Sequence, residues 1–345
     1  MNRQRLLELD ALRGLAALSV VFYHYFFRYD QLYGHAGLSV DWTYYGKFGV
    51  QLFFMVSGFV IFWTLNKIER PLDFVASRFS RLYPAYWAAV LFTFSFVYIF
   101  GLSGREVSPG HAMSNLLMFH EIFGIPHVDG VYWTLTVELI FYFWIFLIYL
   151  TSNLERVEEI FSVVILASVL HSMGVILIPS VLFRALIMDA LPLFMAGICF
   201  YKLANGYDGA IKTMCALFFS LLSTVAIYSF DHFILFSGFY LVFYMAISGR
   251  IKVLALKPLV FLGSISYSLY LLHQNIGYVI INVSYELGFH PLLGICFSLL
   301  IVIILSTIFM KYVENPSLRY IRRTYKNNKN IQRLARKMTF HGIRS

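Results

Sequence analysis

Long apolar stretches separated by short polar segments run along most of this chain. Within each stretch the apolar residues are continuous and do not alternate with polar ones. This pattern is typical of helices that cross a membrane and argues against the strands of a membrane barrel. We therefore predict ten membrane spans. Their approximate bounds are 9–27, 48–65, 82–101, 131–151, 160–178, 183–201, 211–229, 232–248, 259–284 and 291–312.

The composition supports the same class of protein. Hydrophobic residues make up 59% of the chain and charged residues 13%, and the mean hydropathy is +0.72. Soluble domains carry about 25% charged residues, so the sequence predicts an all-α, polytopic bundle of transmembrane helices. The net charge of +9 does not lie on a soluble domain, and we expect no nucleic-acid partner. The three cysteines show no zinc spacing, and we assign no metal ligand.

The distribution of basic residues predicts the orientation of the chain. If the N-terminus is cytoplasmic, most of the 27 Lys and Arg residues fall in the segments on the cytoplasmic side. Positive charge gathers on that side of membrane proteins, so both termini should be cytoplasmic. We divide the chain into a membrane domain, 1–316, and a basic cytoplasmic tail, 317–345. The tail is expected to be solvated or to lie on anionic lipid headgroups.

The first predicted span contains three ionisable residues: Asp10 and Arg13 near its start and His24 near its end. Ionisable groups inside a span are costly and usually face a cavity, a partner or a site. Arg13 and His24 are close to three helical turns apart, so they share one face at a separation of roughly 16 Å. A long ligand could place its charged end at Arg13 and its reactive end near His24. Alternatively, Arg13 reaches to the interface and His24 is a packing residue.

The third span is entered through a pair of arginines, Arg78 and Arg81, on one face of the starting helix. Two guanidinium groups in this arrangement can hold phosphates in a fork. The alternative is that they serve only the orientation of the protein in the membrane.

Two later spans carry further candidates. Glu138 lies about two turns into the fourth span, where a carboxylate should be paired, and a histidine is its natural partner. Tyr270 and His273 lie near the middle of the ninth span, and Glu314 meets the cytoplasmic surface just before Pro316, which should end the last helix. The candidates therefore form two levels. Asp10, Arg13, Arg78, Arg81 and Glu314 are cytoplasmic, whereas His24, Glu138 and His273 lie in the middle or outer half.

Together these stretches resemble acyltransferase family 3, integral membrane proteins that O-acylate cell-surface sugars. The similarity runs from about Leu9 to Pro316. The residues that carry it are the LDALRG opening with Arg13 and His24, the pair Arg78 and Arg81, Trp133 to Glu138, SYSLYLLHQ with His273, and VENP with Glu314.

The resemblance implies a multi-pass protein of the bacterial inner membrane that takes an acyl group, most often acetyl, from cytoplasmic acyl-CoA. The acceptor would be a carbohydrate or lipid-linked glycan at the outer face, and the other partners would be membrane lipids. Direct transfer and a transient acyl-histidine both remain open. The implied roles are catalysis for His24 (the general base), Glu138 and His273, binding of acyl-CoA for Arg13, Arg78 and Arg81, and support for Asp10, Trp133, Tyr270 and Glu314.

Three other functions remain open from the sequence. Ten spans with intramembrane charges also suit a transporter or exporter of a small anionic solute or an acylated glycan. The other two are an acyltransferase for lipids or proteins and a non-catalytic scaffold. Release of CoA from acyl-CoA would separate an enzyme from a transporter or a scaffold.

Overall fold

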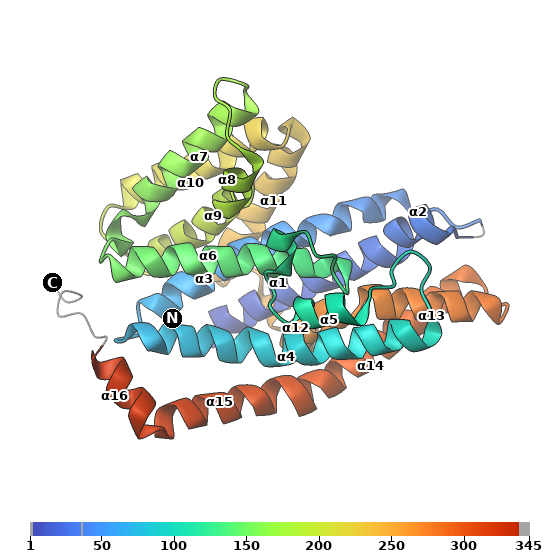
Figure 1. Ribbon diagram of the computed structural model, residues 1–345. Coiled ribbons are helices and arrows are strands. Elements are labelled where there is room, and N and C mark those ends of the chain that lie inside the picture. The colour runs from blue at the N-terminus through green and yellow to red at the C-terminus, as the bar shows by residue number, and fades with distance from the viewer. Residues whose placement is uncertain (1–2, 36, 338–345) are drawn as a thin grey trace.

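The fold is described by a computed structural model that covers residues 3–35 and 37–337 (Figure 1). Over these residues the regular structure is entirely helical. The α-helices are α1 (Arg3–Phe22), α2 (Tyr29–Tyr33), α3 (Gly49–Leu65), α4 (Pro71–Phe100), α5 (Pro109–Asn115), α6 (Trp133–Leu150), α7 (Val157–Ser172), α8 (Ser180–Ala185), α9 (Leu191–Ala204), α10 (Ala210–Ile227), α11 (Phe230–Ile247), α12 (Lys257–Leu272), α13 (Gln274–Glu286), α14 (Pro291–Phe309), α15 (Asn315–Asn327) and α16 (Lys329–Lys337).

Six helical segments in the described part are long and apolar enough to cross a membrane. Two apolar helices, α9 and α12, are shorter. The prediction of an all-helical, multi-pass architecture is confirmed, whereas the count of ten spans and the cytoplasmic placement of the termini stay predictions. The six segments are Asp41–Leu65, Pro71–Phe100, Gly130–Leu150, Ala210–Ile227, Phe230–Ile247 and Pro291–Asn327.

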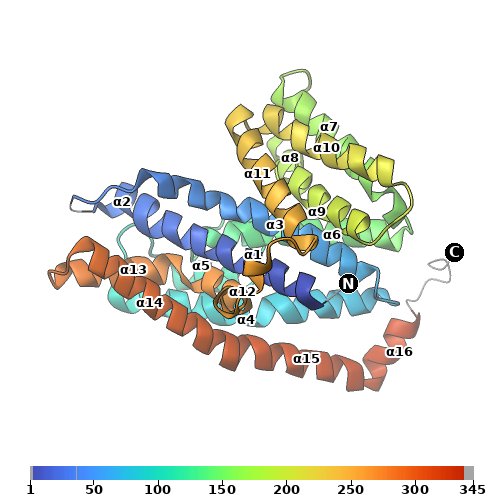
Figure 2. The ribbon, with the colours of Figure 1, turned by 180° about the vertical axis from the view of Figure 1, so that it is seen from behind.

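The helices divide into a long body and an upper lobe (Figures 1 and 2). In both views α7, α8, α10 and α11 stand above the body, while α1, α4, α12, α13 and α14 run along it. Helix α9 joins the two parts because it packs on α3 below and on α10 above. Helix α1 is enclosed by α3 and α12, which places the charged first span inside the body.

A pair of glycines lets α1 and α12 approach closely. A Cβ atom added to Gly263 would lie 2.1 Å from the carbonyl oxygen of Asp10, and one added to Gly14 would lie 2.5 Å from the backbone nitrogen of Gly263. Small residues at helix contacts allow such an approach between backbones in a membrane. As a result, α12 lies beside the face of α1 that carries the candidate residues.

The prediction that Pro316 ends the last helix is wrong. A π-helical turn, Met310–Glu314, follows α14, and the chain continues as α15 with Pro316 in its first turn. Proline lacks an N–H, which is tolerated in the first turn of a helix. Helix α15 then packs along α4, so the beginning of the predicted tail lies against the membrane domain.

The ninth predicted span is two helices, because α12 and α13 are interrupted at His273. Side chains satisfy the backbone groups around the interruption. The Tyr25 hydroxyl donates to the carbonyl oxygen of His273 at 2.9 Å, and Asp129 Oδ2 accepts from the backbone N–H of Asn275 at 3.0 Å. Unsatisfied backbone groups are costly inside a membrane, so these two side chains stabilise a break at His273.

Candidate active site

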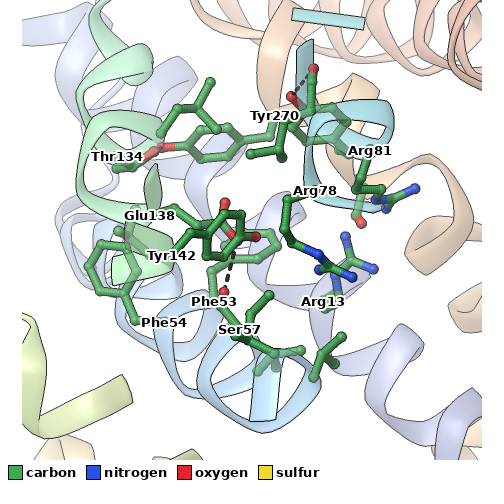
Figure 3. Close-up of a pocket in the computed structure, with 18 residues that line it drawn as sticks. Arg13, Phe53, Phe54, Ser57, Arg78, Arg81, Thr134, Glu138, Tyr142 and Tyr270 are labelled. Atoms are coloured by element: carbon green, nitrogen blue, oxygen red, sulfur yellow. Dashed lines mark hydrogen bonds between the residues drawn. The ribbon is translucent and has the colours of Figure 1, made fainter. Parts of the chain in front are cut away.

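A cavity of about 120 Å³ opens between α1, α3, α4, α6 and α12 (Figure 3). It brings together side chains from both ends of the sequence. The lining residues are Arg13, Val50, Phe53, Phe54, Val56, Ser57, Val60, Ile61, Arg78, Arg81, Leu82, Thr134, Leu135, Glu138, Tyr142, Ser266, Tyr267 and Tyr270.

Three guanidinium groups gather at one side of this cavity (Figure 3). They belong to Arg13, Arg78 and Arg81, the three residues predicted to bind acyl-CoA. Arg13 forms a long ion pair with Asp10 at 3.7 Å. Arg78 donates to the hydroxyl of Thr64 at 3.3 Å and has no carboxylate within ion-pair distance in the described part of the chain. This arrangement leaves positive charge available for an anion.

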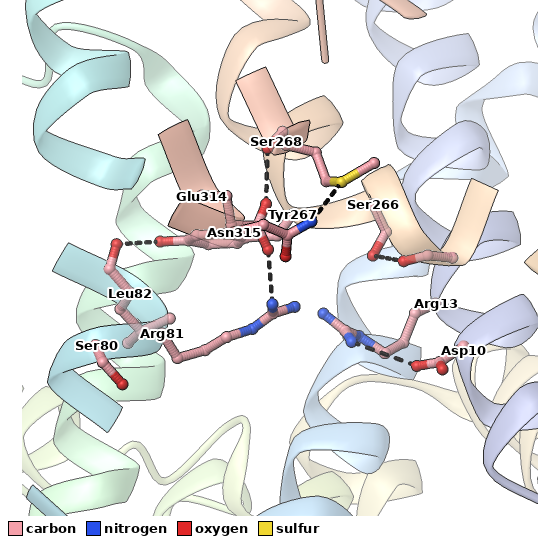
Figure 4. A network of polar contacts seen from close by, with 12 residues as sticks. Asp10, Arg13, Ser80, Arg81, Leu82, Ser266, Tyr267, Ser268, Glu314 and Asn315 are labelled. Carbon is pink, nitrogen blue, oxygen red and sulfur yellow. Dashed lines mark hydrogen bonds and ion pairs between the residues drawn. The ribbon is translucent and has the colours of Figure 1, made fainter. Parts of the chain in front are cut away.

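Arg81 is held in place by the buried carboxylate of Glu314 (Figure 4). The two groups form an ion pair at 2.6 Å, and the hydroxyl of Ser268 donates to the other oxygen of Glu314 at 2.7 Å. Figure 4 shows the guanidinium groups of Arg81 and Arg13 pointing toward each other across an open space. Glu314 thus fixes the direction of Arg81, and its supporting role in the reaction stays a prediction.

The structure adds a fourth arginine, Arg322, which the sequence analysis missed. Its Nε lies 3.4 Å from the hydroxyl of Ser80 on α4, and it is close enough to Arg78 and Arg81 for mutual repulsion. Arg322 looked like one of many basic residues in the tail. Only the continuation of the helix past Pro316 places it beside the cavity.

Glu138 lines the cavity but is not bonded to any histidine among residues 3–35 and 37–337. Its carboxylate accepts hydrogen bonds from Ser57 Oγ, at 2.8 Å, and from the hydroxyl of Tyr142. The geometry therefore does not provide the predicted pairing of Glu138 with a histidine. Glu138 instead places a negative charge in the lining of the same cavity that the three arginines line.

Tyr270 closes the cavity at the end that faces the candidate histidines. Its hydroxyl is 2.8 Å from Thr134 Oγ1 and donates to the carbonyl oxygen of Val131 at 3.1 Å. The ring of Tyr270 contacts Phe53 on one side and His273 on the other, each with ring centres 5.7 Å apart. One tyrosine side chain therefore separates the arginine-lined cavity from His273.

His24 and His273 form a hydrogen-bonded pair beyond Tyr270. His24 is the second residue of a π-helical turn, Tyr23–Arg28, that follows α1, and His273 occupies the break between α12 and α13. Nδ1 of His24 is 3.0 Å from Nε2 of His273. His273 is fully buried, whereas His24 is partly exposed.

The partners of the pair assign its protons. Nδ1 of His273 faces the carbonyl oxygen of Tyr270 at 2.9 Å, so Nδ1 carries the proton and Nε2 can accept. Nδ1 of His24 faces the carbonyl oxygen of Val20 at 2.9 Å and therefore also carries a proton. This assignment leaves Nε2 of His24 as a lone-pair nitrogen, with no hydrogen bond to the described residues. A base whose other nitrogen is held by a second residue is typical of general-base catalysis.

Buried groups beside the histidine pair hold this region together. Asp129 accepts from the backbone N–H groups of Val131 and Asn275, and Nδ2 of Asn275 donates to the carbonyl oxygen of Val128. Burial raises the pKa of Asp129 to about 7, although the two backbone donors lower it. The loop before α6 is thereby fastened to the start of α13, one residue after His273.

Besides Glu314, which reaches the cavity through Arg81, two more predicted supporting residues lie outside the cavity lining. Trp133 is the first residue of α6 and is 40% exposed. The half-exposed side chain of Asp10 contacts the site through its ion pair with Arg13. The structure thus groups the predicted residues as an arginine-lined cavity with Glu138 and Glu314, and a histidine pair beyond Tyr270.

The fold and the cavity define a helical membrane protein with a cationic pocket and a candidate base. A family model described as "Acyltransferase domain" matches residues 6–311, nearly the whole chain. The chain therefore belongs to this acyltransferase family, and the resemblance seen in the sequence is confirmed.

Two curated relatives carry acetyltransferase names. The chain is 24% identical over 322 residues to the peptidoglycan O-acetyltransferase OatA of Listeria monocytogenes, a match that covers 80% of this chain and 50% of that protein. It is also 24% identical over 361 residues to the O-acetyltransferase OatA of Staphylococcus aureus, covering 89% and 56%. The chain thus spans about half of the length of these relatives. No solved structure matches it.

Proposed function

We propose that this protein is a membrane O-acyltransferase that moves an acetyl group from acetyl-CoA to a hydroxyl group of a cell-surface carbohydrate. The donor enters from the cytoplasm, where both chain termini lie, and the acceptor is reached from the outer face. Peptidoglycan is the first acceptor to test, because one relative is named for it. Lipopolysaccharide and exopolysaccharide are the other candidates, and the membrane would be the inner membrane of a bacterium.

The observation that carries this proposal is the position of the arginine cluster relative to the histidine pair. CoA is a phosphate-rich anion, and guanidinium groups bind phosphates in a fork. Arg13, Arg78 and Arg81 surround one cavity, and Tyr270 at its end contacts His273. A thioester that extends from the arginines past a displaced Tyr270 would reach His24.

In the proposed reaction Nε2 of His24 takes the proton of the acceptor hydroxyl as its oxygen attacks the thioester carbonyl. The carbon–sulfur bond breaks, and the proton on His24 passes to the leaving CoA sulfur. The carbonyl oxygen of Tyr270 holds His273, and His273 holds His24, so that the base keeps its orientation. Glu138 has a role on the donor side, where its charge balances the arginines.

Acetyl transfer can be measured in membrane vesicles that contain the full chain and receive radiolabelled acetyl-CoA on the cytoplasmic side. We expect label in peptidoglycan or in another surface glycan, together with release of free CoA. Vesicles without the chain provide the background. Transport of a solute without any CoA release above that background would overturn the proposal in favour of a transporter.

Replacing Arg78 with lysine should raise KM for acetyl-CoA about tenfold and leave kcat nearly unchanged. Lysine keeps the charge but loses the planar fork, and a tenfold loss corresponds to about 1.4 kcal/mol. The matched control is Arg250→Lys, since Arg250 lies in the loop after α11 and stacks on Tyr244. Steady-state kinetics with varied acetyl-CoA measure the effect. An unchanged KM in Arg78→Lys would mean that this arginine does not bind the donor.

A further inference from the structure

We propose that the acceptor sugar binds on the outer side of the histidine pair, against Arg105, Gln274 and Tyr278. This inference rests on the proposed function and adds a specific binding site to it. The three residues lie outside the arginine-lined cavity and play no part in the donor site. Their contacts, the burial of their polar atoms and the accessibility of His24 together support the site.

Tyr278 links the candidate base to Arg105. The ring centre of Tyr278 lies 6.4 Å from that of His24, and the guanidinium carbon of Arg105 lies 5.8 Å from the centre of the same ring. Gly130 brings the third residue close. A Cβ atom at Gly130 would lie 3.0 Å from Oε1 of Gln274 and 3.2 Å from a terminal nitrogen of Arg105. Both groups therefore reach the same small volume next to an aromatic ring and close to His24.

Two buried polar groups in this volume lack partners within the described part of the chain. Oε1 of Gln274 and the hydroxyl of Tyr278 make no hydrogen bond to it, and the two residues are only 3% and 0% exposed. The two side chains are close enough to interact electrostatically, but they are not in hydrogen-bond geometry. An unpaired buried polar group destabilises the fold, so such a group is normally satisfied by a ligand or a water molecule. Here one acceptor and one hydroxyl stand beside a guanidinium group without an ion pair among the described residues.

The chemistry of this surface fits a sugar ring. A pyranose offers hydroxyl groups, which donate and accept, and an apolar face that packs on an aromatic ring. A site built to bond hydroxyl groups rejects ligands that lack them, because its own polar groups would stay unpaired. Arg105 disfavours a cationic ligand and accepts an uncharged or anionic sugar. The partly exposed edge of His24 would then meet the hydroxyl that becomes acetylated.

The separation of the two sites also has a physical consequence. Acetyl-CoA would approach the histidine pair through the arginine-lined cavity, and the sugar would approach from the side of Arg105 and Tyr278. The thioester would be attacked only when both sites are filled, because Tyr270 and His273 stand between the donor cavity and the proposed sugar site. A change in the sugar site should therefore leave donor binding intact.

The test is Tyr278→Phe, which removes only an unpaired oxygen and keeps the ring. With N-acetylglucosaminyl-N-acetylmuramic acid as the acceptor probe, we expect KM for the disaccharide to rise about tenfold and KM for acetyl-CoA to stay unchanged. The thermal stability should not fall, because the oxygen that is removed has no partner among the described residues. Gln274→Met should raise KM for the disaccharide by a similar factor. The matched control is Tyr240→Phe. The hydroxyl of Tyr240 is 3.0 Å from Ser220 Oγ, so its loss should lower stability without changing the acceptor KM.

Photocrosslinking provides a readout that does not depend on turnover. We would place p-benzoylphenylalanine at Phe27, whose ring stacks on Tyr23 next to His24, in cells labelled with radioactive glucosamine. Irradiation should attach labelled glycan at this position, and Tyr278→Phe should reduce the yield. The same photocrosslinking residue placed at Ile61, in the donor cavity, should capture no labelled glycan.

The outcomes separate this inference from the proposed function. Acetylation of glycan with no crosslink at Phe27, or with an unchanged acceptor KM in both Tyr278→Phe and Gln274→Met, would overturn the sugar site and leave the enzyme standing. A crosslink that Tyr278→Phe weakens, without any acetyl transfer, would support the site and contradict the proposed activity.

Discussion

His24→Ala should fold, enter the membrane and bind acetyl-CoA, yet lose acetyl transfer by at least a hundredfold. A general base contributes about 10² to 10⁴ in rate, or about 3 to 5 kcal/mol of barrier. The donor cavity contains no atom of His24, so donor affinity should be preserved. The measurement is turnover of acetyl-CoA into labelled glycan, together with the dissociation constant for acetyl-CoA.

The matched control for this experiment is His171→Ala. His171 also lies in an apolar helix, but it is at the end of α7 in the upper lobe, where its ring bonds to the backbone carbonyl oxygen of Ile176. We expect normal transfer from this variant. The pH profile adds a second readout, because a base must be neutral to take a proton, so activity of the unaltered enzyme rises with pH until the base is deprotonated. The residual rate of His24→Ala should lack that rise. Retention of more than about a tenth of normal turnover would exclude His24 as the base.

The donor side of the site could be predicted from the sequence to a large extent. Arg13, Arg78 and Arg81 were grouped by their depth in the membrane, and the structure places all three around one cavity. Depth is readable because hydropathy locates each residue along its helix and the distribution of Lys and Arg predicts the side. Whether these arginines bind CoA stays a prediction.

The partners of the ionisable residues could not be predicted in the same way. Depth does not say which faces of two helices meet, so Glu138 and His273 were equal candidates for contact with His24. In the structure Gly14 and Gly263 bring α1 against α12, and this contact favours His273. Glu138 turns instead toward Ser57 on α3.

Local backbone irregularities were also hidden from the sequence. The break at His273, the π-helical turn that begins at Tyr23 and the continuation of the helix past Pro316 all depend on tertiary partners. Asp129 supports the first of these from a loop far away in the sequence. Such features are common at functional sites, where side chains replace the regular backbone bonds. Arg322 was missed for the same reason, since its position follows from the helix past Pro316.

His273→Leu should reduce transfer about a hundredfold, while His273→Gln should keep a substantial part of the activity. In the assigned geometry His273 does not touch the substrate. Its Nε2 accepts a hydrogen bond from the protonated Nδ1 of His24. Leucine leaves that N–H with the carbonyl oxygen of Val20 as its one remaining acceptor among the described residues. The contribution of His273 to the orientation of the ring and to its charged form is then lost, whereas the side-chain oxygen of glutamine can still accept. Both variants should keep the KM for acetyl-CoA, because His273 is outside the donor cavity.

The pH profile separates this positioning role from a merely structural one. If neutral His273 accepts a hydrogen bond from protonated His24 and so stabilises it, His273→Leu should move the ascending limb of kcat/KM to lower pH, because that bond to the charged form is lost. His273→Gln should restore part of the shift. If His273 has a merely structural role, both variants should lose stability. The molecules that still fold should then show the same ascending limb of kcat/KM as the unaltered enzyme. Equal loss of activity in leucine and glutamine variants, with no movement of the limb, would contradict the assignment of His273 as the residue that orients the base.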